Sequence, residues 1–248
     1  MSSLLHLKKQ EQQIMPLFGG AFVENKPIPF PERGKTQAYS NLFYWAHLEA
    51  GETAEFPLHP HEGFEIMTFV FKGSVEHFDT ASKVYTPLNA GAVQLIQAGS
   101  GVSHSERIIK GTKLFQIWFD PDFSKSMKKD ATYRDYQVDE FEAKRVDGVE
   151  SLFYLKEKGP IDYQTQGIEI KKLKFSTGKY TERLESEYIY SCYLLDGMMK
   201  IDNQEIQKDD FLVFSETQSL KIEVSEMAEL FVIKSPAEVS YKRFIERY

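Results

Sequence analysis

Short apolar runs, separated by glycine and asparagine turns, fill the chain between residues 43 and 119. The run Glu65–Phe71 (EIMTFVF) is rich in β-branched and aromatic residues and stops at a Lys-Gly pair. Ala92–Ile96 and Lys113–Phe119 have the same character, and each also stops at turn residues. Runs of this length and spacing predict the strands of an antiparallel sandwich or barrel.

A polar segment, Asp122–Gln137, interrupts this pattern and shows no apolar period, so we interpret it as an inter-domain linker. Alternating apolar positions resume at Ile168–Phe175 and continue in further strand-like runs. The chain has 248 residues, which is enough for two small domains at ~100–200 residues each. We therefore expect an N-terminal domain at residues 1–128 and a C-terminal domain at residues 129–248.

The two halves of the chain resemble diverged copies of one unit. Thr68–Gly73 (TFVFKG) begins a strand, a glycine turn and a second strand, followed by a short apolar strand within Asn89–Ile96. Tyr193–Gly197 (YLLDG) begins a similar unit that extends to Lys208–Phe214. A repeat of this kind predicts two stacked antiparallel β-barrels in one chain.

The end of the chain, Ser235–Tyr248, has the signals of a short helix that packs on a sheet. Ser235 is a suitable N-cap, Pro236 suits the first helical position, and Glu238 would complete a capping box. The fold class expected is therefore all-β with a short C-terminal helix.

Composition narrows the class of protein further. Apolar residues make up 42% of the chain and charged residues 27%, which is typical of a globular protein with real cores. No apolar run approaches the ~20 residues of a membrane-spanning helix, and the only cysteine is Cys192. The formal net charge is −7, which disfavours broad contact with nucleic acid phosphates. We expect a cytoplasmic protein that binds neither membrane nor nucleic acid.

The candidate chemistry lies in two pairs of residues, each with one residue between its members. His59-Pro60-His61 places two imidazoles on one face of an extended strand. His104 and Glu106, which follow a glycine-rich turn, share a strand face in the same way. Together the pairs predict a metal site of three imidazoles and one carboxylate, with open coordination positions for water, O₂ or a substrate.

Nitrogen and oxygen ligands without a thiolate suit iron(II), manganese(II), nickel(II), copper(II) or zinc(II). A closed structural zinc site usually has thiolates, so we consider it less well supported. His47 and His77 have no partner at a suitable spacing, and we expect neither to bind the metal. Glu65 lies four positions after His61 and is a candidate for an alternative ligand or for a hydrogen-bond partner of a ligand.

Four stretches resemble the pirin family of the cupin superfamily: HPHEGFE (59–65), GSVEH (73–77), NAGAVQLIQAGSGVSHSE (89–106) and FQIWFDP (115–121). The resemblance implies a bicupin with its metal in the N-terminal barrel alone. It implies iron(II) as the metal and His59, His61, His104 and Glu106 as the ligands. Glu62 replaces the usual arginine of the family motif, which leaves the substrate open.

The resemblance implies two classes of function. Some pirin-like proteins are similar to quercetin 2,3-dioxygenases, which cleave a flavonol with O₂ and release carbon monoxide. In that case Glu106 is the catalytic base, and Phe43, Tyr44, Trp45 or Phe64 could stack on a planar ring. The alternative is an iron-dependent regulatory protein that binds a transcription factor or a metabolic enzyme. A metal-binding bicupin acting on some other small molecule remains a third reading, and we expect a monomer in each case.

Overall fold

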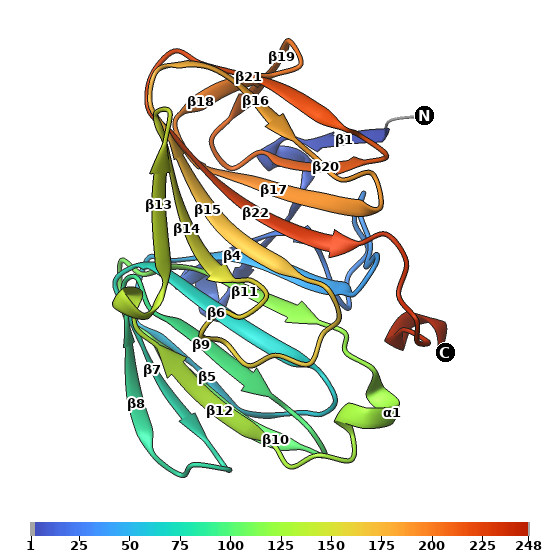
Figure 1. The fold of residues 1–248 in the computed structure, drawn as a ribbon. Helices are drawn as coiled ribbons and strands as arrows, with labels where there is room; N and C mark the ends of the chain where they lie inside the picture. The colour runs from blue at the N-terminus through green and yellow to red at the C-terminus, as the bar shows by residue number, and fades with distance from the viewer. Residues whose placement is uncertain (1–2, 248) are drawn as a thin grey trace. The chain divides into compact units, whose positions relative to one another are not determined.

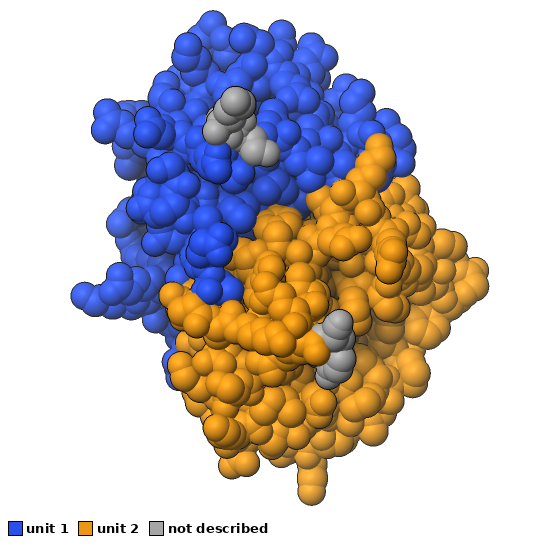
Figure 2. Space-filling model, turned by 90° about the vertical axis from the view of Figure 1, so that its right-hand side faces the viewer, with its two compact units in different colours: residues 1–11, 141–162, 167–239 blue, residues 12–140, 163–166, 240–248 orange. Residues whose placement is uncertain are grey.

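The computed structural model describes residues 3–247 and is built almost entirely of antiparallel strands (Figure 1). The chain divides into two compact units, which are coloured separately in Figure 2. Unit 1 contains residues 3–11, 141–162 and 167–239, and unit 2 contains residues 12–140, 163–166 and the chain from 240 onward. The first strand of the chain thus belongs to the same unit as its second half. The predicted boundary between residues 128 and 129 stays a prediction.

Unit 2 consists of a seven-stranded sheet and a four-stranded sheet. The large sheet has the order β12-β9-β6-β11-β4-β3-β2, and the small sheet has the order β5-β10-β7-β8. The elements are β2 (Gln13–Leu17), β3 (Phe22–Ile28), β4 (Leu42–Ala50), β5 (Ala54–His61), β6 (Glu65–Lys72), β7 (Ser74–Asp79), β8 (Tyr85–Asn89), β9 (Val93–Gln97), β10 (Val102–Ile108), β11 (Lys113–Phe119), α1 (Phe123–Ser126) and β12 (Thr132–Tyr136).

Unit 1 also pairs a seven-stranded sheet with a four-stranded one. Their orders are β1-β20-β17-β22-β15-β14-β13 and β16-β21-β18-β19. The strands are β1 (Ser3–Leu7), β13 (Glu142–Val146), β14 (Val149–Leu155), β15 (Glu169–Phe175), β16 (Gly178–Arg183), β17 (Tyr188–Asp196), β18 (Met198–Ile201), β19 (Gln204–Gln207), β20 (Phe211–Ser215), β21 (Ser219–Val224) and β22 (Ala228–Pro236).

The two strand orders correspond position by position, as the sequence repeat predicts. In each unit the chain leaves the large sheet for the small one at a glycine with positive φ: Gly73 (φ 76) after β6 and Gly197 (φ 81) after β17. A Cβ would lie 2.4 Å from Thr112 Oγ1 at the first site and 2.4 Å from the Met227 carbonyl oxygen at the second. The crossing therefore requires glycine in both copies. The all-β fold class is confirmed, although the described sheets do not close into barrels.

The inward positions of corresponding strands differ in polarity between the two units. In unit 2, apolar side chains of both sheets pack into two clusters. On β10, His104 and Glu106 occupy the inward positions that lie between these two clusters. β21 of unit 1 takes the place of β10 in the strand order, and its inward residues Leu220, Ile222 and Val224 are apolar and buried. Cys192 lies in the same core, where burial raises the pKa of its thiol to about 12.

The predicted linker is wrong, because residues 122–137 are part of unit 2. Asp122 caps α1 by accepting the backbone N–H of Ser124, and β12 pairs with β9 along the edge of the large sheet. The segment lacks an apolar period because two of its inward side chains, Tyr133 and Asp135, are polar and hydrogen-bonded to each other.

The predicted C-terminal helix is also wrong. Ser235 and Pro236 are the last residues of β22, and Ser235 is buried opposite Ile189 of β17. Although these residues favour the start of a helix, the chain here pairs with β17 and remains extended. A single 3-10 turn, Phe244–Glu246, is the helical element that follows β22 in the described chain. No helix within residues 3–247 is long and apolar enough to cross a bilayer.

Candidate metal centre

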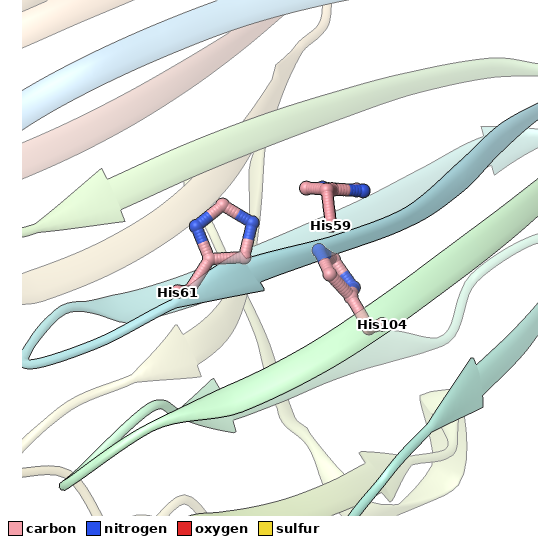
Figure 3. Close-up of side chains that lie close together, drawn as sticks. All are labelled: His59, His61 and His104. Atoms are coloured by element: carbon pink, nitrogen blue, oxygen red, sulfur yellow. The ribbon is translucent and has the colours of Figure 1, made fainter.

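Three imidazoles meet on the inner face of the small sheet of unit 2 (Figure 3). His59 and His61 lie on β5, and His104 lies on β10. The ring centroids are 4.4 Å apart for His59 and His104, 4.8 Å for His61 and His104, and 4.9 Å for His59 and His61. One ring nitrogen from each residue lies within 4.8 Å of those of the other two.

Strand register produces this cluster. β5 runs antiparallel to β10, with His104 directly opposite His59 and Val102 opposite His61. Because alternate residues of a strand face the same side, the two members of the HxH pair point into the unit together. Pro60 points away on β5, which is an edge strand of its sheet and does not need the missing N–H.

Two of the three imidazoles, those of His61 and His104, are suited to binding a metal because they are neutral. Burial, together with the neighbouring imidazoles, lowers the pKa of His61 and of His104 to about 3. Neither ring nitrogen of His104 has a hydrogen-bond partner among the described residues. Nδ1 of His59 lies 2.8 Å from the carbonyl oxygen of Pro57, which leaves Nε2 free to bind. Buried nitrogen lone pairs without partners fit a borderline divalent ion.

Glu106, the fourth predicted ligand, lies beside this cluster and is held by β11. Gln116 Nε2 donates to both carboxylate oxygens of Glu106, at 2.9 and 3.2 Å. Trp118 Nε1 donates to Gln116 Oε1 at 3.2 Å, which fixes the orientation of the amide. A carboxylate oxygen of Glu106 lies within 4.8 Å of ring nitrogens of His104 and of His77. His104 therefore belongs to two overlapping sets of potential ligands.

The structure places His77 in the site, although the sequence gives it no role there. Its side chain is fully buried and lies on β7 directly opposite Glu106 of β10. Burial lowers the pKa of His77. The signal that could have found it is the spacing of His77 and Asp79, which matches that of the other two pairs.

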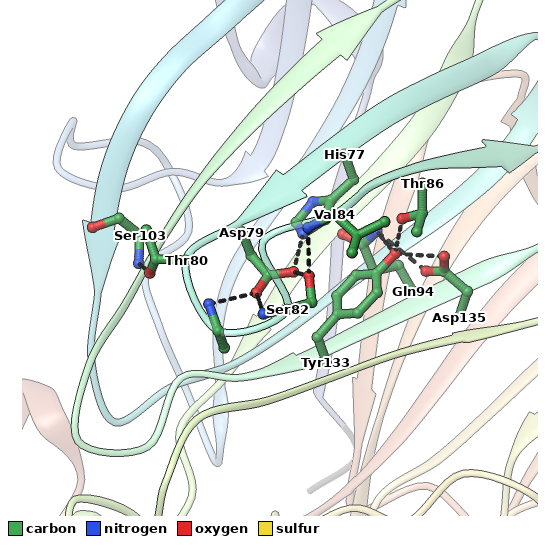
Figure 4. Close-up of polar contacts among 11 residues, drawn as sticks. His77, Asp79, Thr80, Ser82, Val84, Thr86, Gln94, Ser103, Tyr133 and Asp135 are labelled. Atoms are coloured by element: carbon green, nitrogen blue, oxygen red, sulfur yellow. Dashed lines mark hydrogen bonds and ion pairs between the residues drawn. The ribbon is translucent and has the colours of Figure 1, made fainter.

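A network of polar contacts fixes the His77 ring (Figure 4). His77 Nε2 lies 3.4 Å from Asp79 Oδ2, and the ring stacks on Tyr133 with centroids 4.6 Å apart and an interplanar angle of 5°. The Tyr133 hydroxyl hydrogen-bonds Asp135 Oδ2 at 2.5 Å and also contacts Thr86 Oγ1. The imidazole is therefore held by groups on three strands.

Glu65 has structural partners instead. Its carboxylate accepts hydrogen bonds from Gln97 Nε2 and from the backbone N–H groups of Gln164 and Thr165, each at 2.7 Å. The hydroxyl of Thr165 is a further donor to the same carboxylate. These contacts attach residues 163–166 to unit 2. Two other histidines make contacts outside the imidazole cluster. His47 packs edge-on against Phe115, and His6 lies between Gln204 and Asp210.

A cavity of about 300 Å³ adjoins the imidazoles within unit 2. His59, His61, Glu106, Gln116 and Trp118 line one part of it, and Glu24, Lys26, Glu32 and Tyr44 line another. The remaining walls are apolar and include Met15, Leu17, Leu48, Phe56, Ile108 and Leu114. Of the aromatic residues proposed from the sequence to stack on a ring, Tyr44 lines the cavity. The other three, Phe43, Trp45 and Phe64, are buried core residues.

Several known proteins are similar to this chain in sequence or in fold. A protein of Zymomonas mobilis, whose name assigns it provisionally to the quercetin 2,3-dioxygenases, is 27% identical over 186 residues, 74% of this chain and 77% of that protein. The quercetin 2,3-dioxygenase of Escherichia coli K12 is 42% identical over 79 residues, 30% of this chain and 32% of its own length. The bacterial pirin YhhW of Escherichia coli in complex with nickel(II) superposes with a TM-score of 0.79 at 20% identity, covering 95% of this chain and 100% of that one.

Residues 30–119 match the family model described as Pirin, and all four predicted ligands fall within this segment. The chain thus contains a segment that matches the pirin family model, and its fold is similar to that of the bacterial pirin YhhW.

Proposed function

We propose that this protein is a metal-dependent dioxygenase that acts on a flavonol or a closely related hydroxylated aromatic compound. The observation that carries the proposal is the cluster of three imidazoles beside the carboxylate of Glu106, adjoining a cavity with aromatic and apolar walls. The relatives named as quercetin 2,3-dioxygenases support the same reaction class.

The side chains around the cavity suit a planar substrate. Trp118 and Tyr44 lie with ring centroids 5.0 Å apart, and both line the cavity together with Phe56. Such walls bind an aromatic ring by burial and stacking. The volume of about 300 Å³ lies at the lower end of small-molecule pockets. Substrate and O₂ would be held in a space with little room for water.

His59, His61, His104 and Glu106 would hold one divalent ion. We propose iron(II), while nickel(II), manganese(II), copper(II) and zinc(II) suit the same nitrogen and oxygen donors. When bound, the ion supplies a Lewis acid that lowers the pKa of a nearby hydroxyl. The relative YhhW is described with nickel(II). Metal analysis of protein purified without added metal identifies the ion in the cell.

Glu106 is the proposed catalytic base. One of its oxygens takes the proton of the substrate hydroxyl, while the amide of Gln116 keeps the carboxylate oriented. The reaction then consumes one flavonol and one O₂ and gives a ring-opened ester and carbon monoxide. Gln116 acts by positioning the base, so its removal affects turnover more than substrate binding, whereas Trp118 both orients Gln116 and lines the cavity.

The test is aerobic turnover of quercetin by protein loaded separately with iron(II), nickel(II) and manganese(II), with carbon monoxide detected. We expect turnover that is lost in the His59→Ala, His61→Ala double variant and retained in His6→Asn, which alters a histidine in unit 1. A fully loaded site without turnover, with no carbon monoxide, would overturn the proposal. The regulatory alternative would then be examined by searching for a protein partner under reduced and oxidised iron.

A further inference from the structure

A buried lysine lies between two carboxylates in the wall of the same cavity. Lys26 Nζ is 3.2 Å from Glu24 Oε2 and 3.2 Å from Glu32 Oε2, and its side chain is 6% exposed. The ammonium also lies 5.6 Å from the centre of the Tyr44 ring. All four residues line the cavity that adjoins the imidazoles.

Glu24 and Lys26 lie two positions apart on β3 and therefore share one face of that strand. β3 and β4 lose their regular register between Asn25 and Ile28, which is the stretch that contains Lys26. Glu24 and Lys26 are both buried, whereas Val23, which precedes Glu24 on β3, is exposed. Irregularities of this kind often re-aim a side chain next to a functional site.

The charges of this group do not balance. One ammonium faces two carboxylates, so with both carboxylates ionised the group has an excess negative charge. Holding that charge in the poorly solvated wall of the cavity costs free energy unless a further hydrogen-bond donor is present. Burial raises the pKa of Glu24 even though Lys26 opposes that shift. A ligand that brings O–H donors would satisfy the excess carboxylate oxygens, whereas a ligand that brings its own carboxylate would be repelled.

We propose that Glu24, Lys26 and Glu32 form a second polar subsite that binds a substrate ring carrying two adjacent hydroxyl groups. The inference rests on the proposed function and names the substrate class more closely. The hydroxyls donate to the carboxylates of Glu24 and Glu32 and accept from the ammonium of Lys26. The apolar walls hold the body of the molecule, and its reacting hydroxyl faces Glu106.

The test compares the binding of two flavonols that differ only in these hydroxyls. Quercetin carries two adjacent hydroxyls on its pendant ring, and 3,5,7-trihydroxyflavone carries none there. Each is titrated into nickel(II)-loaded protein without oxygen, and the change in flavonol absorbance is followed. We expect quercetin to bind about tenfold more tightly, since hydrogen bonds to charged groups are among the stronger ones.

Variants separate recognition from a structural role of the trio. In Lys26→Met and in Glu24→Gln we expect the preference for quercetin to fall to within about threefold, with binding of 3,5,7-trihydroxyflavone unchanged. Lys113→Met is the matched control, since Lys113 forms an exposed ion pair with Glu49, and it should retain the full preference. The melting temperature of each variant shows that the comparison is made on folded protein.

The outcomes distinguish this inference from the function it rests on. Equal affinity for both flavonols, or a preference unchanged in Lys26→Met, overturns the subsite and leaves the dioxygenase proposal standing. Failure of both flavonols to bind overturns the two proposals together. Tighter binding of an aromatic carboxylate than of quercetin would also contradict the subsite, because Glu24 and Glu32 should repel it.

Discussion

The amide of Gln116 donates to both carboxylate oxygens of Glu106, at 2.9 and 3.2 Å. Gln116 is itself oriented by the indole N–H of Trp118, whose ring lies 4.8 Å from that of His61. One strand, β11, thus positions the candidate base and packs against a candidate metal ligand. The orientation of Glu106 therefore depends on a residue that binds neither metal nor substrate.

Replacing Gln116 with methionine removes the donor and keeps a side chain of similar length. We expect the rate constant kcat for flavonol turnover to fall at least about tenfold, as is common when the partner of a metal ligand is lost. KM should change little, because the cavity walls remain. Steady-state kinetics with a fully metal-loaded protein makes the measurement. Gln204→Met in unit 1 is the control, and a Gln116 variant as active as wild type would contradict a positioning role.

His104 belongs to both sets of potential ligands, whereas His77 belongs to one. We therefore expect His104→Ala to lower the affinity for nickel(II) by more than about 100-fold and His77→Phe to lower it about tenfold. Phenylalanine keeps the stacking on Tyr133 while removing the ring nitrogens. Calorimetric titration of the metal-free protein gives both values. A loss in His77→Phe as large as that in His104→Ala would instead place the metal between His77, His104 and Glu106.

Replacing Glu65 tests whether this residue stabilises the fold or binds the metal. Glutamine at this position replaces one carboxylate oxygen with an NH₂ group. The NH₂ group cannot accept the hydrogen bonds that the backbone N–H groups of residues 164 and 165 donate. We expect Glu65→Gln to lower the free energy of unfolding by about 2–3 kcal/mol, as a broken buried hydrogen-bond group does, with metal affinity unchanged. Thermal unfolding and metal titration are measured on the same sample. Reduced affinity at unchanged stability would instead place Glu65 in the metal site.

Asp120 makes the stability of the protein depend on pH. Its side chain is buried, accepts the backbone N–H of Phe244 at 2.6 Å and has its pKa raised by burial to about 6. The native state thus binds this proton more tightly than the unfolded chain, whose carboxyl has an ordinary pKa of 3.8. This contribution to stability is present below about pH 4 and is lost as the pH rises through 6.

Asparagine at position 120 keeps an acceptor and removes the buried charge. Asp120→Asn should therefore raise the stability at pH 7.5 by on the order of 1–3 kcal/mol, and the gain should shrink toward pH 5. Melting temperatures of the two proteins across this range make the test. A difference that stays constant with pH, or one that grows toward pH 5, would show that Asp120 is charged in the native state throughout.

The sequence predicts the imidazole cluster because strand periodicity is local. His59 and His61 are two residues apart, as are His104 and Glu106, and this spacing alone puts each pair on one face. The meeting of the two pairs depends on the register of β5 against β10, which the sequence motif suggests and the structure shows. The spacing of His77 and Asp79 is a local signal, but the contacts that place His77 in the site come from β10 and from the edge strand β12, far away in the chain.

Local sequence patterns predict the wrong structure in two segments where pairing with a strand distant in the chain determines the conformation. Ser235-Pro236 has the pattern of a helix start, yet its position between β15 and β17 extends β22 through both residues. The segment 122–137 looked like a linker because the polar side chains of Tyr133 and Asp135 satisfy one another inside the unit. Neither contact can be read from a window of neighbouring residues.

The central claim is that His59, His61, His104 and Glu106 bind one divalent ion. X-ray absorption spectroscopy of the nickel(II)-loaded protein tests it most directly, because the scattering pattern counts imidazole ligands. The account predicts three imidazoles with additional oxygen ligands in the wild type, and two imidazoles in any His104→Ala protein that still retains nickel. A wild-type spectrum with one imidazole or with none, at one ion per chain, would contradict it.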